Sequence, residues 1–119
     1  MIITLDNMIF FAHHGVFESE RLNGNTFRVS VHIELDDTPG CTTDRVEDTL
    51  NYQQVYDIVR EEMSHPSNLL EHVANRIIKR LTALDEPSRV SVCVEKQNPP
   101  LGGDVQWVGV TLQHRRHNC

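Results

Sequence analysis

The spacing of apolar residues changes along the chain, and this change limits the folds that are open to it. Between Phe27 and Leu35 every second residue is apolar and the residues between them are polar or charged, as in a β-strand with one buried face. Further on, Val55, Val59 and Met63 recur at every fourth position, as on an amphipathic helix. The strand period returns near the end of the sequence. The chain therefore combines strands at both ends with helices in the middle.

Six regular elements follow from this pattern. They are strands over Ile2–Ala12 and Phe27–Leu35, helices from Asn51 to about His65 and from Ser67 or Asn68 to about Leu84, and strands over Val90–Lys96 and Val105–Gln113. The first strand is expected to be interrupted near Asp6 and Asn7, and the segment Gly15 to Asn25 is predicted to be a loop. Pro66 ends the first helix, because proline disfavours helical geometry in the residue before it.

The order strand, strand, helix, helix, strand, strand predicts an α+β fold. We expect a four-stranded antiparallel sheet with both helices on one face, formed by residues 1–119 as a single domain. From about His114 the sequence becomes a polar tail, where disorder is expected. A domain of this size has little volume for a deep ligand cavity of its own, so a site shared between subunits is an early expectation.

Charge and cysteine content narrow the classes of function. The net charge is −6 and the sequence contains no basic stripe, so we expect no nucleic-acid partner. No run approaches 18 apolar residues, so no membrane span is expected. Cys41, Cys93 and Cys119 cannot all pair within one chain, and the first residues do not resemble a signal peptide. These features predict a reduced, cytoplasmic protein.

Four short motifs resemble the signatures of the dihydroneopterin aldolase family. They are His14-Gly15 with Glu20, Gly24 and Phe27; Asp44 with the run Asp48 to Tyr52; the run Asn68 to His72; and the run Lys96 to Leu101, with Val108-Gly109-Val110 fitting the last strand. Each motif is short, but they occur together at matching spacing over nearly the whole chain. The resemblance implies a tunnelling fold, in which the sheets of several subunits pair edge to edge into a barrel. It also implies a homo-oligomer, either a tetrameric ring or an octamer of two stacked rings.

The reaction implied by the resemblance is the retro-aldol cleavage of 7,8-dihydroneopterin, a pterin, in folate biosynthesis. It yields 6-hydroxymethyl-7,8-dihydropterin and glycolaldehyde. Breaking the carbon–carbon bond leaves an electron pair, which many aldolases place on a lysine Schiff base or a metal-bound group. The substrate's own ring imine can accept these electrons, so we expect no cofactor and no metal.

The resemblance also implies which residues bind the substrate. Glu71 would accept two hydrogen bonds from the ring N–H and the exocyclic amino group, and Leu70 would contribute its backbone while its side chain joins the core. The alternative for Glu71 is a capping box with Asn68. Glu20 would bind the trihydroxypropyl side chain, or orient Lys96 and a water. The alternative for Glu20 is a solvated charge on a loop.

Lys96 and Tyr52 are the candidate catalytic residues. Lys96 shares a strand face with three valines, Val90, Val92 and Val94, where a lysine is unusual and suited to general acid–base work. Its alternative is a strand-end lysine that reaches into water. Tyr52 would supply a second proton-transfer group and lie near the pterin, from the neighbouring subunit. Its alternative is an aromatic residue at a helix start that packs on the core.

Three other functions are compatible with parts of this pattern. A zinc-dependent pterin synthase shares the tunnelling fold, and the chain has seven histidines, but His13 and His14 are adjacent on an extended segment and would point opposite ways. A non-catalytic pterin-binding protein would keep Glu71 but would not need both Lys96 and Tyr52. An epimerase acting on dihydroneopterin or its triphosphate would use the same bond cleavage and stays open.

Overall fold

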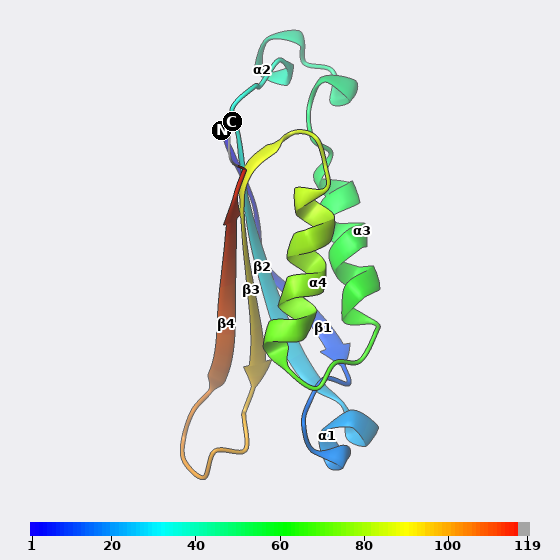
Figure 1. The fold of residues 1–119 in the computed structure, drawn as a ribbon, viewed down its shortest axis with the longest axis vertical. Coiled ribbons are helices and arrows are strands. Elements are labelled where there is room, and N and C mark those ends of the chain that lie inside the picture. The colour runs from blue at the N-terminus through cyan, green and yellow to red at the C-terminus, as the bar shows by residue number, and fades with distance from the viewer. Residues whose placement is uncertain (117–119) are drawn as a thin grey trace.

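The computed structural model describes residues 1–116, which form one antiparallel sheet with two long helices on one face (Figure 1). The strands are β1 (Ile2–Ala12), β2 (Asn25–Leu35), β3 (Pro87–Gln97) and β4 (Trp107–Arg115), in the spatial order β1-β2-β3-β4. The long helices are α3 (Tyr52–Met63) and α4 (Leu70–Thr82). The predicted α+β fold, with a four-stranded antiparallel sheet and both helices on one face, is therefore confirmed.

The core lies between the sheet and the two helices. Alternate residues of β2 and β3 face the helices and are almost fully buried, as the period of two predicts. The buried side chains are Phe27, Val29, Val31 and Ile33 from β2, Val90, Val92 and Val94 from β3, and Val55, Val59, Val73, Ile77 and Leu81 from the helices. Each such side chain contributes about 1.5–3 kcal/mol to folding. A one-residue slip of either strand would turn these side chains to water, so the packing fixes the register.

β1 contains the irregularity that the sequence predicts at Asp6 and Asn7. Its pairing with β2 shifts register between Leu5 and Met8, and Asn7 adopts a positive φ of 54°. The hydroxyl of Ser30 accepts a hydrogen bond from the Asn7 N–H at 3.0 Å and donates one to Asp6 at 3.3 Å. The extra residue of this bulge lets Leu5 and Met8 both face the core.

The two long helices start differently. α3 begins after Asn51, whose side chain accepts a hydrogen bond from the Gln53 N–H at 2.9 Å, and it ends at Met63, before the proline that was predicted to stop it. α4 begins after Leu69, two to three residues later than predicted. In the described part of the chain, no side-chain hydrogen bond caps its first turn.

The connecting segments contain more structure than predicted. The segment predicted as a loop from Gly15 to Asn25 includes the helix α1 (Glu18–Asn23). The segment after β2 includes α2 (Gly40–Thr43) and the 3-10 helix η1 (Val46–Asp48). None of these three short helices buries a residue, so an apolar period could not reveal them.

β4 continues through Arg115 and so extends into the segment predicted as a polar tail. The rest of that tail, with Cys119, lies outside the described residues. Across residues 1–116, every helix is too short or too polar to span a membrane.

The molecule is elongated, about 51 Å by 29 Å by 24 Å, and its two ends differ (Figure 1). At one end lie α1, the start of α4 and the end of β3; we call this the α1 end. At the other end lie α2, η1 and the start of α3; we call this the α2 end. The predicted site residues are divided between these two ends.

Candidate active site

The central feature of the α1 end is an ion pair between Lys96 and Glu20. Lys96 stands opposite Phe27 across β2 and β3, on the side of the sheet that faces the helices, as its place in the strand period predicts. Its Nζ lies 2.6 Å from Oε2 of Glu20, and the two side chains are only 15% and 14% exposed. The structure therefore joins two predicted site residues that are 76 positions apart in the sequence.

Glu20 is held in place by the short helix α1 and by the turn before it. Its Oε1 accepts a hydrogen bond from the Phe17 N–H at 3.3 Å. A Cβ atom at Gly15 would lie 2.5 Å from the Cβ of Glu20, so only glycine allows this approach. Arg21 fixes the same turn by donating to the carbonyls of Gly15, at 3.2 Å, and Val16, at 2.7 Å. The Glu20 side chain is thus held by two hydrogen bonds, from Lys96 and the Phe17 N–H, and by its close approach to Gly15.

The charge state of Glu20 follows from these contacts. Burial by itself would raise the pKa of the Glu20 carboxyl. The hydrogen bonds from Lys96 and from the Phe17 N–H, with the charges of Lys96 and Arg21, outweigh burial and hold the pKa below its usual range. Glu20 is therefore a carboxylate at neutral pH, paired with the lysine ammonium. Its alternative as a solvated loop charge is wrong.

Leu70 and Glu71 open α4 at the same end of the molecule. The Leu70 side chain is half-buried and packs against the core, as predicted. Glu71 is exposed in the first turn, where a carboxylate is favoured by the helix dipole. The capping box of Asn68 with Glu71 is wrong, because the N-cap residue is Leu69. Glu71 therefore does not cap α4, and its side chain is exposed to solvent at the α1 end.

Tyr52 lies at the α2 end, where α3 begins (Figure 1). It is 66% exposed, so its alternative as a core-packing residue is wrong. The aromatic residue of α3 that packs inward is Tyr56, which stacks on Phe10 with ring centroids 5.9 Å apart. The 12 residues of α3 rise about 18 Å between the two ends. A single subunit therefore separates Tyr52 from Lys96, Glu20 and Glu71.

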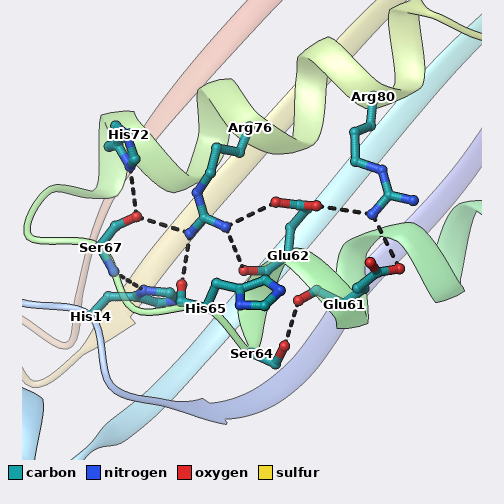
Figure 2. A network of polar contacts seen from close by, with 9 residues as sticks. All are labelled: His14, Glu61, Glu62, Ser64, His65, Ser67, His72, Arg76 and Arg80. Atoms are coloured by element: carbon teal, nitrogen blue, oxygen red, sulfur yellow. Dashed lines mark hydrogen bonds and ion pairs between the residues drawn. The ribbon is translucent and has the colours of Figure 1, made fainter.

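His14 and Ser67 lie at the α1 end, and the sequence analysis assigns no chemistry to either residue. His14 is 1% exposed, and its Nδ1 accepts a hydrogen bond from the Ser67 N–H at 3.0 Å (Figure 2). The Gly15 N–H donates to the Ser67 carbonyl at 2.9 Å. The His14 ring packs edge-on against Phe27, with centroids 5.1 Å apart. No local sequence pattern connects His14 with Ser67, because the two residues are 53 positions apart.

His14 is held neutral by its surroundings. Burial, followed by the positive charge of Arg76, lowers the pKa of His14 to about 4; a backbone contact at Met63 opposes this shift, and His13 adds a smaller lowering. The neutral ring can therefore act as an acceptor at Nδ1, with its proton on Nε2. The Nε2 atom is buried and lacks a hydrogen-bond partner among the residues that the structure describes.

Arg76 joins the two long helices next to this pair (Figure 2). Its guanidinium donates to the backbone carbonyl of Glu62 at 3.1 Å and to the Glu62 carboxylate at 2.9 Å. Arg80 donates to the second carboxylate oxygen at 2.9 Å. Burial by itself would raise the pKa of Glu62, but these hydrogen bonds from Arg80 and Arg76 lower it. The three side chains fasten α3 to α4.

A zinc site would need several histidine or other ligands that converge on one point. His13 and His14 make separate contacts: Nδ1 of His13 lies 2.9 Å from the Arg21 carbonyl, and Nδ1 of His14 binds the Ser67 N–H. Within residues 1–116, no three His, Cys, Asp or Glu side chains lie close enough together to hold a metal ion.

Comparison with solved structures defines the class of fold. The chain is similar to Escherichia coli dihydroneopterin aldolase, solved in complex with neopterin, with a TM-score of 0.87 and 19% identity over 96% of this chain and 98% of that one. It is also similar to dihydroneopterin aldolase from Burkholderia thailendensis, solved bound to guanine, with a TM-score of 0.80 and 20% identity over 98% and 92% of the two chains. These likenesses place the chain in the same fold class.

Sequence comparison identifies the family. A dihydroneopterin aldolase from Staphylococcus epidermidis is 34% identical over 113 residues, which is 93% of each chain. The family model for dihydroneopterin aldolase, FolB, matches residues 3–113. The chain belongs to the dihydroneopterin aldolase family, and the resemblance seen in its motifs is confirmed.

Proposed function

We propose that Lys96, Glu20 and Glu71 of one subunit, with Tyr52 of a neighbouring subunit, form the site at which this member of the family cleaves 7,8-dihydroneopterin. The chain is an aldehyde-lyase of folate biosynthesis, and its products are 6-hydroxymethyl-7,8-dihydropterin and glycolaldehyde. The observation that carries the assignment of the site is the ion pair of Lys96 and Glu20, which lies at the same end as the exposed Glu71. The cytoplasmic location expected from the cysteine pattern belongs to the same proposal.

Glu71 is the proposed ligand for the pterin ring. Neopterin and guanine, which are bound by the two solved relatives, share an edge on which a ring N–H lies beside an exocyclic amino group. One carboxylate can accept both of these hydrogen bonds, and the charge strengthens them. Glu71 is available for this role because it is exposed and does not belong to a capping box with Asn68. The backbone of Leu70 would contribute a further hydrogen bond.

Lys96 is the proposed proton carrier for bond cleavage. When the side-chain carbon–carbon bond breaks, its electron pair moves into the ring imine, whose nitrogen must gain a proton. The hydroxyl on the departing fragment loses its proton and becomes the aldehyde of glycolaldehyde. Lys96 would donate to the ring nitrogen, and Glu20 would orient Lys96 and a water that takes the hydroxyl proton. The remaining enol would then be protonated on carbon by Tyr52 while the ring nitrogen returns its proton to Lys96, which restores the ring imine and gives the hydroxymethyl group.

Completion of the site requires a second subunit. Tyr52 is exposed at the α2 end, and β1 and β4, of 11 and 9 residues, are the edge strands of the sheet. Long unpaired edges are normally covered or paired, and closing several sheets into a barrel pairs all of them. We therefore include a homo-oligomer in the proposal, either a tetrameric ring or an octamer of two rings, in which Tyr52 reaches the α1 end of its neighbour.

The test is to incubate the purified protein with 7,8-dihydroneopterin and to separate the pterin products by chromatography. We expect 6-hydroxymethyl-7,8-dihydropterin and an equal amount of glycolaldehyde, and no cleavage by Lys96→Ala run in parallel. If the main product were the epimer at the second side-chain carbon, the protein would be an epimerase. Pterin binding without any product would support the non-catalytic alternative. Either result would contradict the proposal.

A further inference from the structure

The hydrogen bonds of His14 and Gly15 to Ser67 connect the two segments that carry the proposed substrate ligands. Gly15 lies in the turn that contacts Glu20, and Ser67 lies four positions before Glu71. The Ser67 N–H donates to Nδ1 of His14 at 3.0 Å, and the Ser67 carbonyl accepts from the Gly15 N–H at 2.9 Å. Both polar groups of the Ser67 backbone are thus used to join the β1–α1 turn to the α3–α4 turn.

The Ser67 side chain extends this connection into α4 (Figure 2). Its hydroxyl lies 2.7 Å from Nδ1 of His72, in the first turn of α4, and accepts a hydrogen bond from Arg76 at 2.9 Å. Arg76 also donates to the His65 carbonyl at 2.7 Å. The N-cap residue Leu69 provides no side-chain cap within the described part of the chain. The position of the α4 start therefore depends on Ser67 rather than on a cap of its own.

The imidazole of His14 serves this connection only in its neutral form. A protonated ring has N–H groups on both nitrogens and could not accept from the Ser67 N–H. The nearby guanidinium of Arg76 and the burial of the ring both disfavour protonation. Nε2 is buried and makes no hydrogen bond of full geometry among residues 1–116, although the Met63 backbone lies close enough to raise the pKa of the ring. The feature that an apolar side chain could not supply here is the acceptor at Nδ1.

We propose that His14 is a positioning residue for substrate binding: through its hydrogen bond with Ser67 it holds the start of α4, and with it the Glu71 carboxylate, at a fixed place relative to Glu20. This inference depends on the proposed function, because it takes Glu71 and Glu20 as ligands of the pterin and its side chain. His14 itself does not touch the substrate. It acts on the substrate through Ser67 and the first turn of α4.

The test compares three variants of His14 in the full-length oligomer. In His14→Asn, the side-chain oxygen occupies nearly the place of Nδ1 and keeps the acceptor. In His14→Gln, the amide extends toward the place of Nε2, and in His14→Leu no acceptor remains. Displacing a binding group by about 1 Å can cost up to about 100-fold. We expect KM for 7,8-dihydroneopterin to rise at least about tenfold in the Gln and Leu variants, with kcat changed much less, and to stay near wild type in the Asn variant.

A second readout reports on the hydrogen bond itself. Amide hydrogen exchange of the peptide that contains residues 64–70, followed by mass spectrometry, should accelerate in the Gln and Leu variants and remain slow in the Asn variant. The matched control is Val90→Ala, a buried residue at the far end of β3, which should lower the temperature of unfolding without changing KM. If His14→Leu fails to fold, the comparison of Asn with Gln still decides the question.

Three results would overturn the inference. They are a wild-type KM in both His14→Gln and His14→Leu, an equal rise in KM in His14→Asn and His14→Gln, and unchanged exchange of residues 64–70 in every variant. Failure of the proposed function looks different, because the wild-type protein would then form no 6-hydroxymethyl-7,8-dihydropterin at all. Normal wild-type turnover with unaffected variants would therefore refute the role of His14 alone.

Discussion

Replacing Lys96 with methionine tests whether the ion pair at the α1 end is a buried, functional contact. Methionine keeps an unbranched side chain but removes the charge that lies 2.6 Å from the Glu20 carboxylate. Breaking a buried ion pair by removing one partner typically costs about 3–5 kcal/mol. Because 14–15% of each side chain still contacts water, we expect a loss at or just below the bottom of this range, about 2–3 kcal/mol of unfolding free energy at pH 7.

The pH dependence of this loss has a definite sign. In the wild type, the pKa of Glu20 lies below its ordinary value of 4.5, so the carboxylate contributes stability above pH 4.5 that is lost as pH falls through the lowered pKa. In Lys96→Met the hydrogen bond and the charge of Lys96 are gone, so only the Phe17 N–H and Arg21 still oppose burial, and the pKa of Glu20 should be higher than in the wild type. The unpaired acid is best tolerated when protonated. The stability difference between the two proteins should therefore be largest at pH 7 and shrink below pH 4.5.

The assay is denaturant unfolding at pH 7 and pH 4, together with turnover of 7,8-dihydroneopterin. Turnover should fall at least about 100-fold, the lower range for a general acid–base group. Glu20→Gln and the double variant complete a double-mutant cycle, in which the two single losses should not add. If Lys96→Met kept wild-type stability at both pH values and normal turnover, Lys96 would be a solvated strand-end residue and the proposed site would be wrong.

Three further predictions follow from the site. Glu71→Gln places an amide donor opposite ring N–H groups, so pterin affinity should weaken by about 2–5 kcal/mol; unchanged affinity in a fluorescence titration would exclude Glu71 as the ring ligand. Turnover should be unaffected by dialysis against EDTA, because the ring imine accepts the electrons; activity lost to EDTA and restored by zinc would contradict a metal-free reaction. The pKa of His14 is 6.5 in the unfolded chain and is lowered to about 4 in the folded protein by burial, then by Arg76, with a smaller effect of His13. The free energy of unfolding should therefore be highest above pH 6.5 and fall by up to about 3 kcal/mol as the pH approaches 4. His14→Asn should lack this part of the decline in denaturant unfolding, and an identical pH profile would show that His14 is not held neutral.

The sequence predicts the fold and part of the site because both follow from the period of apolar residues. The alternation of β3 places Lys96 on the helix-facing side, and the break in the period of β1 marks the bulge at Asn7. Local motifs predicted the helix start less well than the apolar period predicted the strands. Asn68 and Glu71 match a capping box, but the neighbouring Ser67 forms hydrogen bonds with His14 and Gly15, and the helix begins after Leu69.

The residues that sequence analysis could not place depend on distant partners. Ser67 lies 53 positions from His14, and no local pattern links them. The helix α1, which holds Glu20 beside Lys96, has no buried residue and therefore no apolar period. Tyr52 was predicted to act from a neighbouring subunit, and its exposure at the far end of α3 agrees with that prediction but does not test it.

The central claim, that each site combines Lys96 of one subunit with Tyr52 of another, is tested most directly by mixing two defective variants. Lys96→Ala should be nearly inactive, and Tyr52→Phe should still cleave the bond but divert the intermediate to other pterins. Co-expression in equal amounts creates some sites with Lys96 from one variant and Tyr52 from the other. With random assembly, about one quarter of the sites should be intact and should form 6-hydroxymethyl-7,8-dihydropterin at about one quarter of the wild-type rate. A mixture with no more of this product than the two variants assayed separately would contradict the shared site.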